Sequence, residues 1–125
     1  MNDMYRENIL DLYKSPLNKG KLENSTHEFS KNNPLCGDEI AIQLFVKNNI
    51  IDDVKFQGNG CAISMAAASM ITEKIKNMNL NEVKSLNKDD ILEMIKIPLS
   101  PVRLKCALLS LDVVKGALEN ESKSI

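Results

Sequence analysis

The spacing of the apolar residues changes near the middle of this 125-residue chain, and that change constrains its fold class. Over residues 39–57 apolar side chains alternate with polar ones, which is the period-two pattern of a half-buried β-strand. The pair Asn48-Asn49 interrupts the alternation, and asparagine tolerates the left-handed conformation of a tight turn. We therefore predict an antiparallel hairpin of two strands, over residues 39–47 and 50–57.

Helical spacing replaces the alternation further along the chain. Gly58 and Gly60 are expected to end the second strand, and Cys61 to stand at the start of a helix. The polar segment 21–33 is compatible with an edge strand. Further helices are predicted over residues 4–14, over 79–97 as two short pieces with a break near 87–89, and from Ser100-Pro101 to about residue 119. Because strands precede most of the helices, the predicted class is α+β.

Composition narrows the class of protein further. A hydrophobic share of 43% and a charged share of 26% are typical of a globular chain, and the length fits one domain over residues 1–125. The net charge of −1 argues against a nucleic-acid partner. The longest nearly apolar stretch, residues 61–71, is interrupted by Ser64 and Ser69 and is far shorter than the roughly 20 residues of a membrane span. No membrane partner is expected, and the first residues lack the apolar region of a signal peptide.

Three cysteines stand at positions 36, 61 and 106. Their number is odd and none lies in a C-x-x-C pair, so a disulfide scaffold, a zinc ribbon and a thioredoxin-like motif are not expected. Cys36 lies in a loop, Cys61 at a predicted helix start and Cys106 in the second turn of the last predicted helix. All three lie near the ends of elements, where a fold can gather them into one site. Free thiols of this kind indicate a reducing, cytoplasmic setting.

Two of the cysteines have neighbours that favour the thiolate. The helix start at Cys61 offers unpaired N–H groups, and Arg103 and Lys105 place positive charge near Cys106. Asp38, two residues after the first cysteine, is the nearest plausible fourth ligand. Three thiolates and one carboxylate suit tetrahedral zinc, and the same set can hold a [2Fe–2S] cluster. An oxygen ligand binds soft iron more weakly than sulfur does, so such a cluster would be labile, as a donor of clusters requires.

The residues alone leave three alternatives open. Free cysteines often pack as small buried hydrophobic residues, with Cys106 as the best case here. A cysteine-nucleophile enzyme needs a base, and the only histidine is His27, which we expect on the surface. A purely structural zinc protein would use the same ligands without moving sulfur.

In their order and local sequence, these motifs resemble the IscU/SufU/NifU N-terminal family of iron–sulfur cluster assembly proteins. The resemblance extends over nearly the whole chain, to about residue 118. It depends on the segments ILDLYKSPLNKG, NPLCGDEI, VKFQGNGCAISMAAASMITE and PVRLKCALL.

The resemblance implies an α+β fold in which a small antiparallel sheet of about three strands packs against several helices and the cysteines converge at one end. It implies a site of Cys36, Asp38, Cys61 and Cys106 that binds iron, a [2Fe–2S] cluster or zinc. A cysteine desulfurase would supply the sulfur, and iron–sulfur carrier or recipient proteins would be further partners. The protein would be a scaffold and sulfur acceptor, not an enzyme in the strict sense.

The match combines features of two branches of that family. Lys105 precedes the third cysteine as in the SufU type, whereas the IscU type has histidine there. The implied sulfur acceptor is Cys36 in the SufU type and Cys106 in the IscU type. A SufU-type protein would be a zinc-dependent sulfurtransferase that activates the desulfurase without holding a cluster. The segment between Cys61 and Cys106 lacks the insertion typical of the SufU type. Residues 99–103 retain only part of the chaperone-recognition motif of the IscU type, so a chaperone is a partner only if that remnant suffices.

Overall fold

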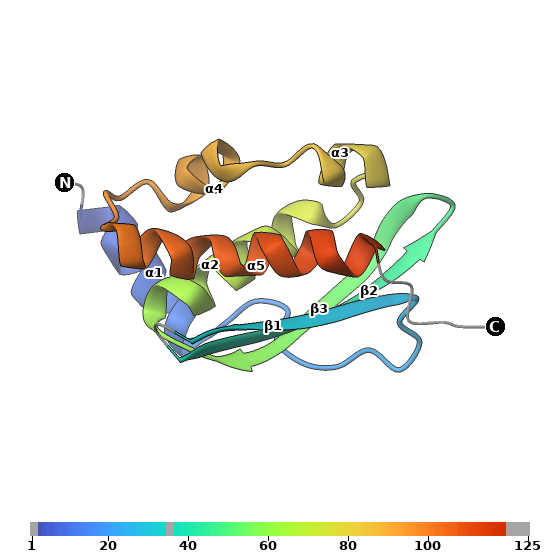
Figure 1. Ribbon diagram of the computed structural model, residues 1–125, viewed down its shortest axis with the longest axis horizontal. Coiled ribbons are helices and arrows are strands. Elements are labelled where there is room, and N and C mark those ends of the chain that lie inside the picture. The colour runs from blue at the N-terminus through green and yellow to red at the C-terminus, as the bar shows by residue number, and fades with distance from the viewer. Residues whose placement is uncertain (1–2, 35–36, 120–125) are drawn as a thin grey trace.

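Three antiparallel strands form a sheet along one side of the molecule (Figure 1). The computed structural model describes residues 3–34 and 37–119. The strands are adjacent in chain order, with the bounds β1 (His27–Asn33), β2 (Asp38–Lys47) and β3 (Ile50–Asn59). Asn48 and Asn49 join β2 to β3 with φ values of 54° and 68°, so the predicted hairpin and its turn are confirmed.

β3 ends at Asn59, directly before Gly60, so of the two glycines predicted to end the strand Gly60 does so and the prediction for Gly58 was wrong. β3 continues through Gly58 to Asn59, and Gly58 pairs with Ile40 of β2. Gly58 has a φ of 146°, and a Cβ atom there would collide with the backbone carbonyl of Glu39. The glycine therefore allows the two strands to approach closely at the end of the sheet that leads to Cys61.

Helices account for most of the remaining chain, and the α+β class is confirmed. Their bounds are α1 (Asp3–Lys14), α2 (Ala62–Ile75), α3 (Leu80–Lys84), α4 (Lys88–Ile95) and α5 (Pro101–Glu119). Ser100 caps α5 as predicted, because its Oγ accepts the Arg103 N–H at 3.3 Å. The break between α3 and α4 lies at residues 85–87, slightly before its predicted position, because Asn87 is the N-cap of α4.

All the helices lie on the same side of the sheet (Figure 1). α5 packs on β1 and β2, and α2 packs on β3 and against α5. α4 packs on both of these helices, α3 on α5, and α1 on α2. Enclosed in this way, α2 is buried almost all round, and every residue from 63 to 69 is inaccessible to solvent or nearly so. The start of α2 is therefore held firmly against the end of the sheet.

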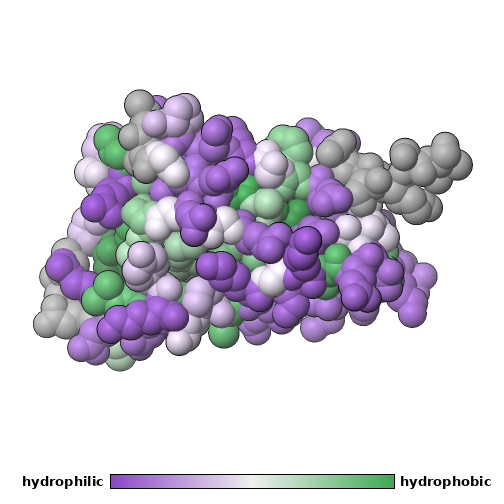
Figure 2. Space-filling view, turned by 90° about the horizontal axis from the view of Figure 1, so that it is seen from below, coloured by the Kyte–Doolittle hydropathy of each residue, from purple (hydrophilic) through white to green (hydrophobic). Residues whose placement is uncertain are grey.

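The segment that connects α1 to β1 first pairs with the outer edge of β3 and then crosses the opposite face of the sheet. The Asn18 carbonyl accepts the Phe56 N–H at 2.9 Å, and Gln43 Oε1 accepts the Leu22 N–H at 2.8 Å. Hydrophilic side chains cover much of the surface on this side, with hydrophobic ones between them (Figure 2). Within residues 3–34 and 37–119, no helix is both long enough and apolar enough to cross a membrane.

Candidate metal centre

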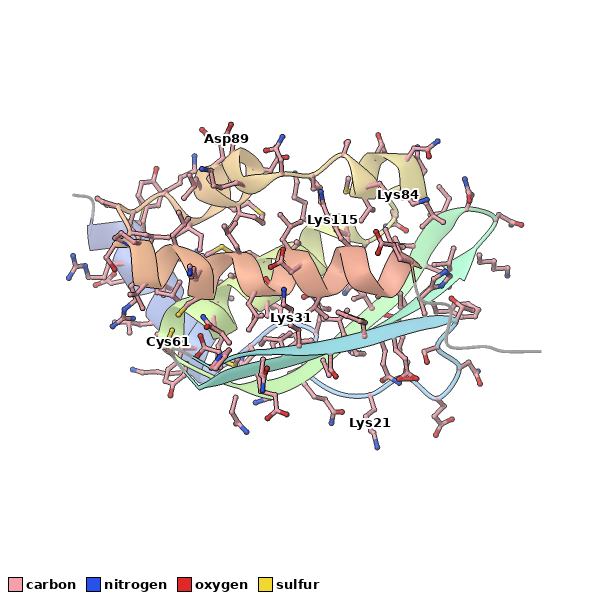
Figure 3. The ribbon with its side chains drawn as sticks, viewed as in Figure 1. Lys21, Lys31, Cys61, Lys84, Asp89 and Lys115 are labelled. Carbon is pink, nitrogen blue, oxygen red and sulfur yellow. The ribbon has the colours of Figure 1, made fainter. Side chains whose placement is uncertain are left out.

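Three of the four predicted ligand positions lie in the described chain, and the fold brings all three together. Asp38 is the first residue of β2, Cys61 immediately precedes α2, and Cys106 lies in the second turn of α5. One carboxylate oxygen and the two Sγ atoms all lie within 4.8 Å of one another. Figure 3 shows Cys61 at the end of the sheet where α2 begins. Asp38 and Cys106 are buried, and Cys61 is partly exposed.

The Asp38 carboxylate is the centre of the hydrogen bonds in this group. Its Oδ1 accepts the backbone N–H of Cys61 at 3.0 Å, and its Oδ2 accepts the hydroxyl of Ser64 at 2.6 Å. The Cys106 side chain also donates to the carboxylate. Both oxygens are therefore oriented by the chain, although Asp38 has no exposed surface.

These contacts decide the charge of Asp38. Burial by itself raises the pKa of the carboxyl group, because it disfavours the charged form. The hydrogen bonds from Cys106, Ser64 and the Cys61 N–H, together with the charge of Arg103, outweigh burial and hold the pKa of Asp38 below its ordinary value. The group is therefore anionic at neutral pH and has the charge that an oxygen ligand of a metal ion needs.

Two residues that support this group were not predicted to belong to the site. Gly60 leaves room for the carboxylate, because a Cβ atom at this position would lie 2.6 Å from Oδ1 of Asp38. Ser64, which in the sequence only interrupts an apolar stretch, is 1% exposed and donates to Asp38. The GNGC sequence is compatible with a close approach at Gly60, but no local signal pairs Ser64 with a residue 26 positions earlier.

The donor set fits a thiophilic metal ion. Bonds of about 2.3 Å to sulfur and 2.0–2.2 Å to oxygen in tetrahedral zinc place neighbouring ligand atoms roughly 3.5–3.8 Å apart. The separations here are at most 4.8 Å, so small side-chain movements would bring the three atoms to coordination distance. Two thiols and one carboxylate also leave a tetrahedral position for a further ligand.

Cys36 lies outside the described residues, so only its neighbours locate it along the chain. Asn33 and Asp38 are partners in the β1–β2 pairing, and the Gly37 N–H donates to the Asn33 carbonyl at 2.8 Å. Pro34 and Gly37 are both exposed. The segment that includes position 36 therefore starts and ends beside Asp38.

The two basic residues near Cys106 are both exposed. The charge of Arg103 acts on Asp38, as described above. Lys105 lines a shallow hollow together with Asn33 and Pro34, next to the segment that leads to position 36. The predicted positive charge therefore lies at the rim of the site.

The prediction of a surface position for His27 was wrong. Its side chain is 7% exposed, and its Nδ1 lies 2.9 Å from the Thr26 hydroxyl. His27 begins β1 and Asn33 ends it, so at about 3.3 Å per residue the histidine is roughly 20 Å from the site end of that strand. This distance excludes His27 as a base for Cys61 and Cys106, and the enzyme alternative that depended on it loses its support for these two cysteines.

The fold and the site together define a small α+β protein with a cluster of two thiols and one carboxylate, a candidate metal centre, at one end of its sheet. Comparison with known proteins identifies the family, because the NifU-like N-terminal domain matches residues 4–124. The chain belongs to this family.

The chain aligns with individual relatives over almost the full length of both proteins. The chain is 36% identical, over 138 aligned positions, to the zinc-dependent sulfurtransferase SufU of Bacillus subtilis, covering 97% of this chain and 93% of that protein. It is 32% identical to the iron–sulfur cluster assembly scaffold protein IscU of Escherichia coli, covering 91% of each. A crystal structure of a proposed iron–sulfur cluster assembly scaffold protein for the SUF system, from Fervidobacterium islandicum AW-1, superimposes with a TM-score of 0.81 at 28% identity and covers 94% of this chain and 99% of that one.

The lengths of the alignments with SufU and IscU can be compared with the mixture of SufU-type and IscU-type features in the sequence. It spans 138 positions, more than the 125 residues of this chain, so the Bacillus protein has residues without a counterpart here. The alignment with IscU spans 118 positions. The chain thus has greater identity to SufU and a length compatible with IscU.

Proposed function

We propose that this protein is a scaffold for iron–sulfur cluster assembly that accepts sulfur from a cysteine desulfurase. The proposal depends above all on the convergence of Asp38, Cys61 and Cys106 from three separate elements, with ligand atoms within 4.8 Å of one another. The names of the relatives, an IscU scaffold and a SufU sulfurtransferase, agree with this function. Iron and sulfur would be the cargo of the site, and iron–sulfur carrier or recipient proteins would take it over.

Cys36 is proposed as the third thiolate of the site. It lies two residues before Asp38 in the chain, within the short segment that leaves β1 and returns to β2. The described part of the site supplies two thiols and one carboxylate, so a third cysteine completes a four-ligand set. When bound, zinc or iron would keep these thiols in the thiolate form.

Sulfur transfer is a thiol–disulfide type of exchange, in which a thiolate of this chain attacks the outer sulfur of the desulfurase persulfide. A new S–S bond forms on this chain, the S–S bond on the desulfurase breaks, and the desulfurase cysteine leaves as a thiolate. The acceptor thiolate has to be accessible. Cys106 is 1% exposed and Cys61 only partly exposed, whereas both Pro34 and Gly37, which flank residues 35 and 36, are exposed, so we propose Cys36 as the acceptor.

A zinc-dependent sulfur acceptor that activates the desulfurase without holding a cluster is the second candidate. It is favoured by Lys105 at the position before the third cysteine and by the 36% identity to SufU. In either case the free thiols need a reducing compartment, so we place the protein in the cytoplasm.

Anaerobic incubation with ferrous iron, cysteine and a cysteine desulfurase tests the proposal. We expect a visible absorption band of a cluster, and a gain of one sulfur in the intact mass. Cys36→Ser is expected to abolish the mass gain, and Cys106→Ser, the matched control, to retain it. Bound zinc and a mass gain without a cluster band would favour the second candidate. Neither a band nor a mass gain would overturn both.

A further inference from the structure

Ser64 contacts all three described ligand residues. It lies in the first turn of α2, three residues after Cys61, and is 1% exposed. Its Oγ lies 2.6 Å from Oδ2 of Asp38, 3.7 Å from the Sγ of Cys61 and 3.4 Å from the backbone carbonyl of Cys106. A buried serine in the first turn of a helix thus lies at the meeting point of β2, α2 and α5.

The geometry decides where the single proton of this hydroxyl goes. The distance of 2.6 Å to Asp38 is that of a strong hydrogen bond to a carboxylate, whereas 3.4 Å to the Cys106 carbonyl is long. Ser64 therefore donates to Asp38, and its lone pairs face the thiol of Cys61. If Cys61 becomes a thiolate, the bond from Ser64 to Asp38 is retained.

Two other hydrogen bonds reach the carboxylate, from the Cys61 N–H and from the Cys106 side chain, and the Cys106 thiol would lose its proton on binding a metal ion. The Cys61 N–H holds Oδ1 on the side where the absence of a Cβ atom at Gly60 makes room for this oxygen. The hydroxyl of Ser64 holds Oδ2 of Asp38, so Oδ2 would lose its shortest contact if this hydroxyl were removed. In metal sites, partners that hydrogen-bond to a ligating side chain orient it, and their loss typically weakens metal affinity about 10–100-fold.

We propose that Ser64 is a positioning residue, whose hydroxyl holds the Asp38 carboxylate in the orientation in which it joins Cys61 and Cys106 as a metal ligand. This inference rests on the proposed function to the extent that Asp38 binds the metal. It adds a residue that acts on the metal only through Asp38.

Metal release measures this role without any sulfur transfer. The zinc-loaded full chain is mixed with an excess of a chromogenic chelator, and the rate of zinc loss is compared among variants. Ser64→Ala is expected to release zinc about tenfold faster or more. Ser110→Ala is the matched control, because Ser110 is a buried serine of α5 whose hydroxyl has no hydrogen-bond partner among the described residues. It is expected to release zinc as the parent does.

A double-mutant cycle with Asp38→Ala separates positioning from a general structural role. If Ser64 acts through Asp38, adding Ser64→Ala to Asp38→Ala causes no further acceleration of zinc loss. Cobalt(II) provides a spectroscopic readout, since its visible bands report the ligand field. Ser64→Ala is expected to shift those bands toward the spectrum of Asp38→Ala while keeping the sulfur-to-metal absorption.

Ser64→Thr keeps the hydroxyl and is expected to restore zinc retention and the parent cobalt spectrum. If circular dichroism shows that Ser64→Ala does not fold, the rate of zinc loss from Ser64→Thr is compared with that from Asp38→Ala instead. The inference would be overturned if Ser64→Ala lost zinc as slowly as the parent, or if a folded Ser64→Thr lost zinc as fast as Asp38→Ala. Either result would leave the proposed function intact. A parent chain that binds neither zinc nor cobalt would overturn both.

Discussion

Gly60→Ala is expected to destabilise the metal-free protein, although alanine can adopt the backbone conformation of this residue. The φ angle of Gly60 is not in the left-handed region. At such positions a change from glycine to alanine usually stabilises by about 0.4–1 kcal/mol, because it restricts the unfolded chain. Here the new Cβ atom would lie 2.6 Å from Oδ1 of Asp38 and 3.1 Å from the Cβ of Ser64. The buried carboxylate would have to move.

The magnitude follows from two costs that oppose the gain in the unfolded state. Overpacking a filled site costs about 1–3 kcal/mol. Moving the carboxylate also weakens its hydrogen bond from the Cys61 N–H, and a bond to a charged group contributes about 1.5–3 kcal/mol when intact. With partial loss of that bond, we expect a net destabilisation of about 2–3 kcal/mol.

Urea denaturation of the metal-free protein, followed by circular dichroism, measures this effect. The Asp38→Ala background is the control, because it removes the carboxylate that the new methyl group would strike. In that background Gly60→Ala should cost at least about 1 kcal/mol less than in the parent. If Gly60→Ala is as stable as the parent, or costs the same in both backgrounds, the reasoning about the close approach is refuted.

Three further predictions concern stability. Ser110→Ala is expected to leave the melting temperature unchanged or to raise stability by up to about 1 kcal/mol, because the buried hydroxyl of Ser110 has no hydrogen-bond partner among the described residues. A clearly lower melting temperature would contradict this. Asn87→Ala is expected to cost about 1 kcal/mol in urea denaturation, because α4 loses its N-cap, and an unchanged urea midpoint would show that the cap contributes nothing. The lowered pKa of Asp38 stabilises the folded metal-free protein above the ordinary aspartate pKa, and this contribution is lost as the pH falls through the folded-state pKa. Asp38→Asn should therefore flatten the acid side of the plot of urea midpoint against pH, and a profile with the parent's slope would count against these contacts.

Local patterns in the sequence predicted most of the fold. Alternation over residues 39–57 predicted the hairpin, and the turn at Asn48-Asn49 has the left-handed conformation expected of asparagine. The helix start at Cys61 and the cap at Ser100 follow from signals within a few residues. Such features are predictable because their physical causes, side-chain periodicity and backbone preference, act over short separations in the chain.

Predictions failed where the deciding contact comes from a distant part of the chain. The sequence around His27 is polar and residues 28–32 of the same strand are exposed, yet the tertiary structure buries the histidine. Gly58 was expected to end a strand, but β2 lies so close that only glycine fits there and the strand continues. In both cases the tertiary structure overrode the local signal.

The sequence by itself determined which residues are able to bind a metal, because the thiols of Cys61 and Cys106 and the carboxylate of Asp38 are properties of residue type. Only the tertiary structure decided that they meet, with Asp38 in the hydrogen bonds of Cys61, Ser64 and Cys106. The physical reason is that burial raises the pKa of a carboxyl group, so the pKa is lowered only where several hydrogen-bond donors reach the carboxylate at once. These donors come from α2 and α5, which only the packing of both helices on the sheet brings to β2.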